Sequence, residues 1–426
     1  MDEQGFDAVL AWGRPFGDSG QARHHVRQDI ERGLAAGAPE GRMLLAAVAP
    51  LDTEERWRVL ADPLVRAALR GALPPQVLHT VAGTAPAAGP RVWGLRRGPD
   101  EHLPALAERT LCVPGPRERA ALRDAARTLR TTLPRVWDGA VRHVRLVAVA
   151  AEPDGPYVPG AAFVERAALG DPATAAARLL DEALRQKLAD VAEAHPLTVP
   201  RAARATVDAP WEPPGLCEAG HWDTARAVTA LHGYVHLAVL HTLRGTDGRA
   251  AYERAHHLGD RLTTTARDGL TPAGRLLTAR LGRVLAATGH PPPPPGAVLH
   301  LLLDRYVREA AGVAAGPLAH DSLLQPQLRA EMRAVRTVLA ALGAWTELGE
   351  LTAAQRHLPY AEARRRIAAT LRRLAPDGRS LEPLAPGADR TLRLMVEHGS
   401  RELALLGALT PPRPRTPTHR PGARSG

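Results

Sequence analysis

Aromatic side chains make up only 4% of this chain, although hydrophobic residues make up 45% of its 426 residues. A folded core must therefore be built mainly from Leu, Val and Ala, which favours helices over a sandwich of strands. This composition predicts a mainly α, multi-helical protein. The length is large for one core and indicates two lobes or one large, elaborated domain.

The excess of basic residues is almost entirely arginine. The formal net charge is +10, Lys187 is the only lysine, and asparagine is absent, which is the imprint of GC-rich coding. Because the arginines are dispersed among acidic residues without interleaved aromatics, we expect no nucleic-acid partner. No apolar run reaches about 18 residues and no apolar leader follows the N-terminus, so we expect a cytoplasmic protein without a membrane partner.

Capping residues and apolar periodicity mark the helices. Asp52 and Glu55 form a capping-box pattern at a helix over 53–61. Asp171 caps a helix over 171–194, with Pro172 in its first turn. The apolar stripe of this helix is Ala176, Leu180, Leu184, Leu188 and Val191. Further helices are predicted over 22–36, after Asp62, over 118–133, 223–243 and 271–287, with three or four more over 297–408.

One short β-hairpin is predicted at about 144–164. The segment 144–150 is apolar and largely β-branched, and 157–164 has a similar pattern. The residues between them, 152–155, are typical of a turn.

Four segments carry a family resemblance. Residues 181–188 read DEALRQKL, 209–212 read APWE, 231–239 read LHGYVHLAV and 270–275 read LTPAGR. Their order and spacing resemble the landmarks HExxHxKL, APWR, LHGxYxHLAV and LTxxGR of the HExxH-motif family of actinobacterial peptide-modifying proteins. One residue fewer separates Gly233 from Tyr234 than in the family pattern, and Lys187 falls on the family's lysine position. The resemblance covers about a third of the chain.

The resemblance implies peptide β-hydroxylation with Fe(II) and 2-oxoglutarate, in the biosynthesis of ribosomally made peptide natural products. The helical domain like that of the family is expected at 101–409. A Pro-, Gly- and Ala-rich stretch at 84–100 separates it from an N-terminal helical lobe at 1–100. Residues 410–426 are mostly Pro, Arg and Thr, which predicts a disordered Pro/Arg tail. Nothing resembles a known family in the N-terminal lobe.

Two metal-ligand positions depart from the family motif. Histidines four residues apart on a helix share one face and reach one metal ion, and His236 matches a third ligand. Here the two positions hold Asp181 and Arg185, and a guanidinium stays protonated and cannot ligate. We therefore expect an ion pair between Asp181 and Arg185 in place of a metal, and no cofactor. Glu212 replaces the arginine of APWR and would repel the carboxylate of 2-oxoglutarate.

The remaining candidate site residues each have two interpretations. Glu182 matches the catalytic glutamate of the motif, or it belongs to a solvated helix face. Trp211, Tyr234 and His232 line a peptide groove, or they are packing residues. His232 and His236, four apart, form a 2-His-1-carboxylate metal site with Asp181 or Glu182, or His232 is hydrogen-bonded packing and His236 a relic ligand.

These departures lead to three functional hypotheses. The first is a divergent, metal-free family member that acts as a peptide-binding partner during maturation of a ribosomally made peptide. Its partner would be a precursor peptide or a peptide-modifying enzyme. The second is an active hydroxylase that uses Fe(II) and 2-oxoglutarate at a rearranged site. The third is a helical protein-interaction module unrelated to peptides.

Overall fold

The computed structural model describes residues 19–82, 90–94, 102–151, 155–200, 206–211, 221–292, 299–316, 324–354, 358–376 and 379–409. It confirms a mainly helical chain with little strand. Two compact units are present, one from residues 1–207 and 222–292 and one from 208–221 and 293–426. The helices within 19–82 and the predicted helix at 171–194 belong to the first of these units. The predicted tail at 410–426 lies outside the described residues.

The described part of the first unit starts with the helices α2 (Ser19–Ala36), α3 (Pro39–Val48), α4 (Thr53–Leu60), α5 (Pro63–Leu69) and α6 (Val77–Ala82). They share one apolar cluster, which includes Val26, Leu34, Leu44, Trp57, Leu64 and Val77. The predicted capping box of α4 is confirmed, because Asp52 accepts from the Glu55 amide at 2.8 Å and Glu55 accepts from the Asp52 amide.

A small sheet lies beside these helices. It contains β1 (Arg91–Val92), β2 (Leu111–Cys112), β3 (Leu146–Ala150) and β4 (Ala161–Glu165). β3 pairs with β1 and β4 in parallel and with β2 antiparallel. The predicted hairpin is therefore wrong in its connection, although both strands exist. The chain crosses over after β3 and re-enters the sheet through Gly160, whose φ of 81° favours glycine. The carbonyl of Gly160 accepts from the amides of Arg145 and Leu146.

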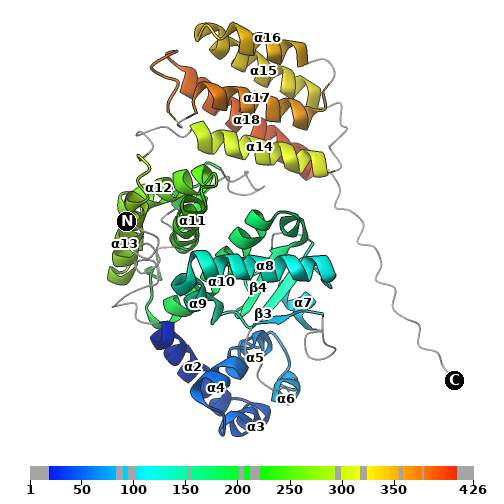
Figure 1. The fold of residues 1–426 in the computed structure, drawn as a ribbon, viewed down its shortest axis with the longest axis vertical. Coiled ribbons are helices and arrows are strands. Elements are labelled where there is room, and N and C mark those ends of the chain that lie inside the picture. Colours follow the sequence, from blue (N-terminus) through cyan, green and yellow to red (C-terminus); the bar gives the residue numbers. More distant parts are fainter. Residues whose placement is uncertain are drawn as a thin grey trace, which may run out of the picture. The chain divides into compact units, whose positions relative to one another are not determined.

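Helix α10 (Pro172–Ala194) is the central helix of the first unit (Figure 1). It packs against α2, α8 (Pro116–Thr132), α9 (Pro134–Val141), α11 (Thr224–Arg244) and β4. Asp171 caps it by accepting from the Thr174 amide at 2.8 Å, and its predicted apolar stripe is buried. The other elements of this unit include α7 (Leu103–Ala107), α12 (Arg249–Thr263), α13 (Pro272–Ala287) and the 3-10 segments Arg166–Gly170 and Arg267–Gly269. A two-stranded sheet joins β5 (Thr206–Asp208) to β6 (His221–Asp223).

The second unit is a stack of helices: α14 (Leu299–Ala315), α15 (Leu324–Ala341), α16 (Trp345–Ala354), α17 (Tyr360–Leu374) and α18 (Ala388–Leu409) (Figure 1). Its apolar core draws on every one of them, with Leu303, Val335, Leu351, Ile367 and Leu392 among its members. In the described part of the chain, no helix combines the length and apolar character that a membrane crossing requires.

Candidate functional site

The two helices that carry the longest segments of the sequence resemblance are in contact. α10 packs directly against α11. The side chain of Asp181 on α10 lies so close to Gly233 on α11 that a Cβ added there would be 2.4 Å from Asp181 Oδ1. His236 stands three residues beyond Gly233 on the same helix. The structure thus brings the first motif position to the helix that carries the expected third ligand.

His232 and His236 form a buried pair on α11. Each is 1% exposed, and their ring centroids are 4.3 Å apart. His236 Nδ1 donates to the carbonyl oxygen of His232 at 2.7 Å, which leaves the lone pair of a neutral ring on Nε2. Burial holds the pKa of His232 well below its usual value, and the charges of His236 and Lys187 lower it further. His232 is therefore neutral in the folded protein.

The expected ion pair between Asp181 and Arg185 is not formed. Arg185 instead places Nη1 3.5 Å from Glu182 Oε1 and lies over the ring of Tyr157, 5.5 Å from its centroid. The Glu182 carboxylate and the Tyr157 ring together attract the Arg185 guanidinium more strongly than Asp181 does. Burial raises the pKa of Asp181, and the charges of Arg178 and Arg185 only partly oppose that rise.

Polar residues form a row along one face of α10 at positions 182, 186 and 190. Glu182 Oε2 accepts from the backbone amide of Phe163 in β4 at 3.1 Å. Burial raises the pKa of Glu182, while Arg185 and the Phe163 amide oppose that rise. Glu182 was predicted to be a catalytic residue or part of a solvated helix face. In the structure it is largely shielded from solvent and binds a backbone amide of β4.

Gln186 continues this row and holds the entry to β4. Its Oε1 accepts from the amide of Gly160 at 2.7 Å and from the hydroxyl of Tyr157 at 2.9 Å. Its Nε2 donates to the carbonyl of Ala161 at 2.6 Å. Among the described strands β4 pairs with β3 alone, so Glu182 and Gln186 satisfy backbone groups on its other edge.

Asp190 ends the row in a charged cluster that the sequence did not predict. Asp190 is completely buried and accepts from Arg66 Nη1 and from His143 Nδ1, each at 2.7 Å. Burial alone would raise the pKa of Asp190, but Arg66 and His143 outweigh it and hold that pKa below its usual value. Burial lowers the pKa of His143 despite Asp190. His143 Nε2 is buried and has no hydrogen-bond partner in the described part of the chain.

Lys187 lies in the same region of α10 and is 2% exposed. A Cβ added at Gly139 of α9 would be 3.2 Å from its Nζ, so the small residue makes room for the ammonium. The charge of Lys187 lowers the pKa of both His143 and His232. The only lysine is therefore enclosed within reach of two imidazoles.

The two aromatic candidates have separate surroundings. Trp211 is completely buried in the second unit, where its carbonyl accepts from Arg308. Tyr234 is partly buried on α11, with the guanidinium of Arg254 5.3 Å from its ring centroid. Trp211 is thus a core residue of its unit, and Glu212 lies outside the described residues.

The side chains at the motif positions do not fit the family's iron site. Arg185 cannot ligate, and Glu182 is committed to the Phe163 amide. Among the described residues, no three His, Cys, Asp or Glu side chains gather into a metal-binding group.

A second charged cluster, also missed from the sequence, lies inside the second unit. Arg364 is completely buried and donates to both carboxylate oxygens of Glu331 at 3.0 and 3.1 Å. It also donates to Glu309 Oε2 at 3.2 Å. The remaining partners are Arg305, Tyr306, Gln327, Tyr360 and Ser400. These polar residues occupy core-facing positions of four helices. Polar residues at such positions are the sequence feature that could have indicated a buried polar cluster.

Comparisons with known proteins add no relative. No protein-family model matches the chain, and a search of curated proteins finds no significant match. The family resemblance therefore depends on the four sequence segments alone.

Proposed function

We propose that this chain is a divergent, metal-free relative of the HExxH-type peptide β-hydroxylases, which acts as a peptide-binding partner in the maturation of a ribosomally made peptide. The observation that carries the proposal is the contact between Asp181 and Gly233. In this contact, α10 and α11 meet at two positions that belong to the resembling segments. The residue at the second ligand position, Arg185, carries a guanidinium that stays protonated and cannot ligate a metal.

Exposure of Arg185 supports a binding role for this site. The side chain of Arg185 is 39% exposed, so its guanidinium is open to a carboxylate or carbonyl of a partner. Glu182 and Gln186 fix β4 against α10, which orders this face before a partner arrives. A precursor peptide, or the enzyme that modifies it, is the partner this proposal expects.

The experiment is a selection of peptides from a display library against the full chain, followed by affinity measurements on variants. Arg185→Ala should weaken the selected peptides about tenfold, since it removes a charged contact. Arg178→Ala is the matched control, because Arg178 is 50% exposed on the same helix and pairs with Glu165. Equal affinities for the two variants would place the peptide elsewhere, and failure to select any peptide would favour the interaction module unrelated to peptides.

The tautomer of His236 favours one second candidate, the active hydroxylase with a rearranged site. A ring that donates from Nδ1 to a backbone carbonyl presents Nε2 as a ligand would. Stoichiometric metal in the purified protein, lost in His236→Ala, would support this candidate and would contradict the metal-free proposal.

A further inference from the structure

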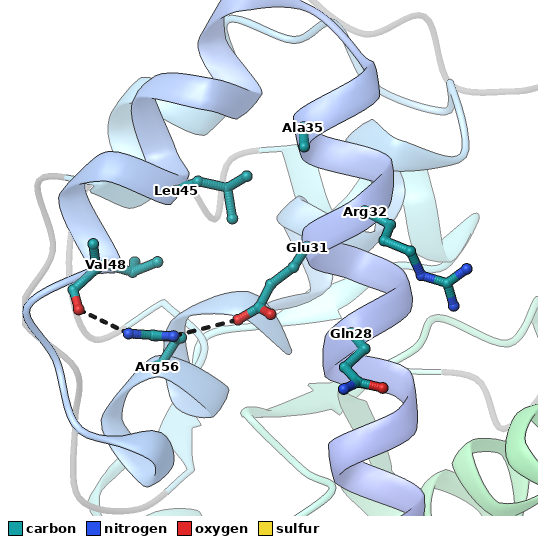
Figure 2. Close-up of a pocket in the computed structure, with 8 residues that line it drawn as sticks. Gln28, Glu31, Arg32, Ala35, Leu45, Val48 and Arg56 are labelled. Atoms are coloured by element: carbon teal, nitrogen blue, oxygen red, sulfur yellow. Dashed lines mark hydrogen bonds and ion pairs between the residues drawn. The ribbon is translucent and has the colours of Figure 1, made fainter.

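A hollow of about 620 Å³ opens between α2, α3 and α4 (Figure 2). Both long walls are helix faces whose residues repeat at i, i+3 and i+4 spacing. The α2 wall contains Gln28, Glu31, Arg32 and Ala35, and the α3 wall contains Leu45, Val48 and the following residue, Ala49. Arg56 reaches across from α4 (Figure 2). We call this feature the α2–α3 groove.

Two contacts hold the guanidinium of Arg56 in the groove. Arg56 Nη2 donates to the carbonyl of Ala49 at 2.7 Å, which fixes the guanidinium. Its Nη1 lies 3.8 Å from Glu31 Oε1, an ion pair too long for a hydrogen bond. Glu31 Oε1 is buried and has no hydrogen-bond partner in the described part of the chain. This carboxylate oxygen of Glu31 can therefore still accept a hydrogen bond.

The surplus charge of the groove is positive. Glu31 lies between Arg56 and Arg27, whose Nε is 4.0 Å away. Arg32 is 75% exposed on the rim and contacts Asp29. Among the charged residues that line the groove, Arg32, Arg56 and Glu31 leave one positive charge in excess, beside the apolar residues of α3.

We propose that the α2–α3 groove binds an amphipathic helical segment of a partner protein or peptide, with aliphatic side chains on one stripe and Asp or Glu beside it. Two helix faces in contact with a third helix are a recurring mode of peptide recognition, with anchors at i, i+3 and i+4. The α2 wall runs for roughly 10 Å, the length of about two helical turns. The volume lies within the range of roughly 300–1,000 Å³ typical of ligand sites. This inference does not depend on the proposed function.

The probes for the test are two designed helical peptides of about 15 residues with the same leucine stripe, flanked either by Glu or by Lys. Their binding to the full chain is measured by fluorescence anisotropy at about 20 and 150 mM salt. The Glu peptide should bind, more weakly at the higher salt, and the Lys peptide should bind at least about tenfold more weakly. Arg32→Glu should narrow that difference. Arg42→Glu, an exposed change on α3 outside the groove, should not.

A steric pair of variants tests the location. Ala35→Trp should fill the groove and abolish binding, whereas Ala36→Trp, exposed at the next position of α2, should preserve it. Equal binding of both peptides, or equal effects of the two tryptophans, would overturn the proposal. Binding tightened about tenfold by deletion of residues 2–17 would assign the groove to the chain's own N-terminal segment instead. A concentration-dependent dimer lost in Ala35→Trp would assign it to a second copy.

Discussion

Asp181 and Gly233 occupy adjoining space on two helices, such that a Cβ at position 233 would approach Asp181 Oδ1 to 2.4 Å. A contact this short admits no side chain at position 233 while Asp181 keeps its place. The closeness of α10 and α11 at the motif therefore depends on a glycine that the sequence resemblance placed in the LHG segment.

Gly233→Ala should lower the free energy of unfolding by about 1–3 kcal/mol, because the new methyl group forces Asp181 to move. Asp181→Ala in the same chain should recover most of that loss. Urea denaturation measures both variants. Gly282→Ala is the control, since nothing lies within 4 Å of a Cβ at that helical position, and it should be neutral or stabilising. A Gly233→Ala protein as stable as the parent would contradict the contact.

Asp181→His combined with Arg185→His should create a zinc or iron site with His236, if the two helices are arranged as in the resembled family. Three imidazoles on preordered helices bind such ions tightly, and binding should raise the melting temperature and release protons. Calorimetric titration of the double variant with zinc measures the affinity. A folded double variant that takes up no metal, or whose metal survives His236→Ala, would show that the proposed alignment of these helices is incorrect.

Gln186→Ala should cost about 1–3 kcal/mol of stability for each buried backbone group it strands, and these groups include the Gly160 amide and the Ala161 carbonyl. Hydrogen exchange of the Gly160 amide should be faster in this variant than in the parent, because the amide has lost its acceptor. Gln28→Ala, a surface change on α2, should alter stability by less than about 0.5 kcal/mol. Unchanged exchange at Gly160 would rule out the role assigned to Gln186.

His143 should make the fold sensitive to acid. Its folded pKa lies below the ordinary value of 6.5, so the unfolded chain binds more protons in that interval. The stability present above 6.5 is therefore lost as the pH falls toward the folded pKa, where a proton on Nε2 would be placed near Lys187 and Arg23.

His143→Asn keeps a donor for Asp190 but does not titrate, so stability should fall less steeply with acid than in the parent. Urea midpoints between about pH 5 and 7.5 give the slopes. Some dependence of stability on pH should remain in the variant, because the pKa of His232 is lowered as well. Parallel curves for parent and variant would exclude His143 as a source of the pH dependence.

Arg364→Leu should lower the unfolding free energy by about 3–5 kcal/mol, because it leaves Glu331 buried without its cation. The double change with Glu331→Leu should cost markedly less, since both charges are then removed. Arg365→Leu, 51% exposed at the next position of α17, should cost no more than about 1 kcal/mol. Equal losses for Arg364→Leu and the double variant in urea denaturation would show that the charges are not coupled.

Helix boundaries were predictable because capping is local. Asp52, Asp171, Asp223 and Thr271 each accept the backbone amide that their position in the sequence assigns to them. The β3–β4 connection was not predictable in the same way. Two apolar strands joined by turn-forming residues have the same pattern whether the chain reverses or crosses over.

The buried polar partners were beyond the reach of the sequence for a different reason. Asp190 and Arg66 are 124 positions apart, and Gln186 and Gly160 are 26 apart. A polar residue on a helix shows its type but not its partner. Glu182 therefore fitted both a catalytic role and a solvated helix face until β4 was in place. The ion pair of Arg185 failed as a prediction because Glu182 and Tyr157 offered it a competing position.

The Arg364 cluster has a consequence for how the second unit can be divided. Its members come from α14, α15, α17 and α18, and Ser400 on the last of these donates to Glu309 on the first. A Cβ at Gly399 would be 2.5 Å from Glu331 Oε1, so α18 also seals the cluster with bare backbone. A fragment that stops before residue 399 would open this cluster to water and leave Glu309 short of a donor. Expression fragments of this unit should therefore retain α18 whole, and α14 cannot be treated as a detachable linker helix.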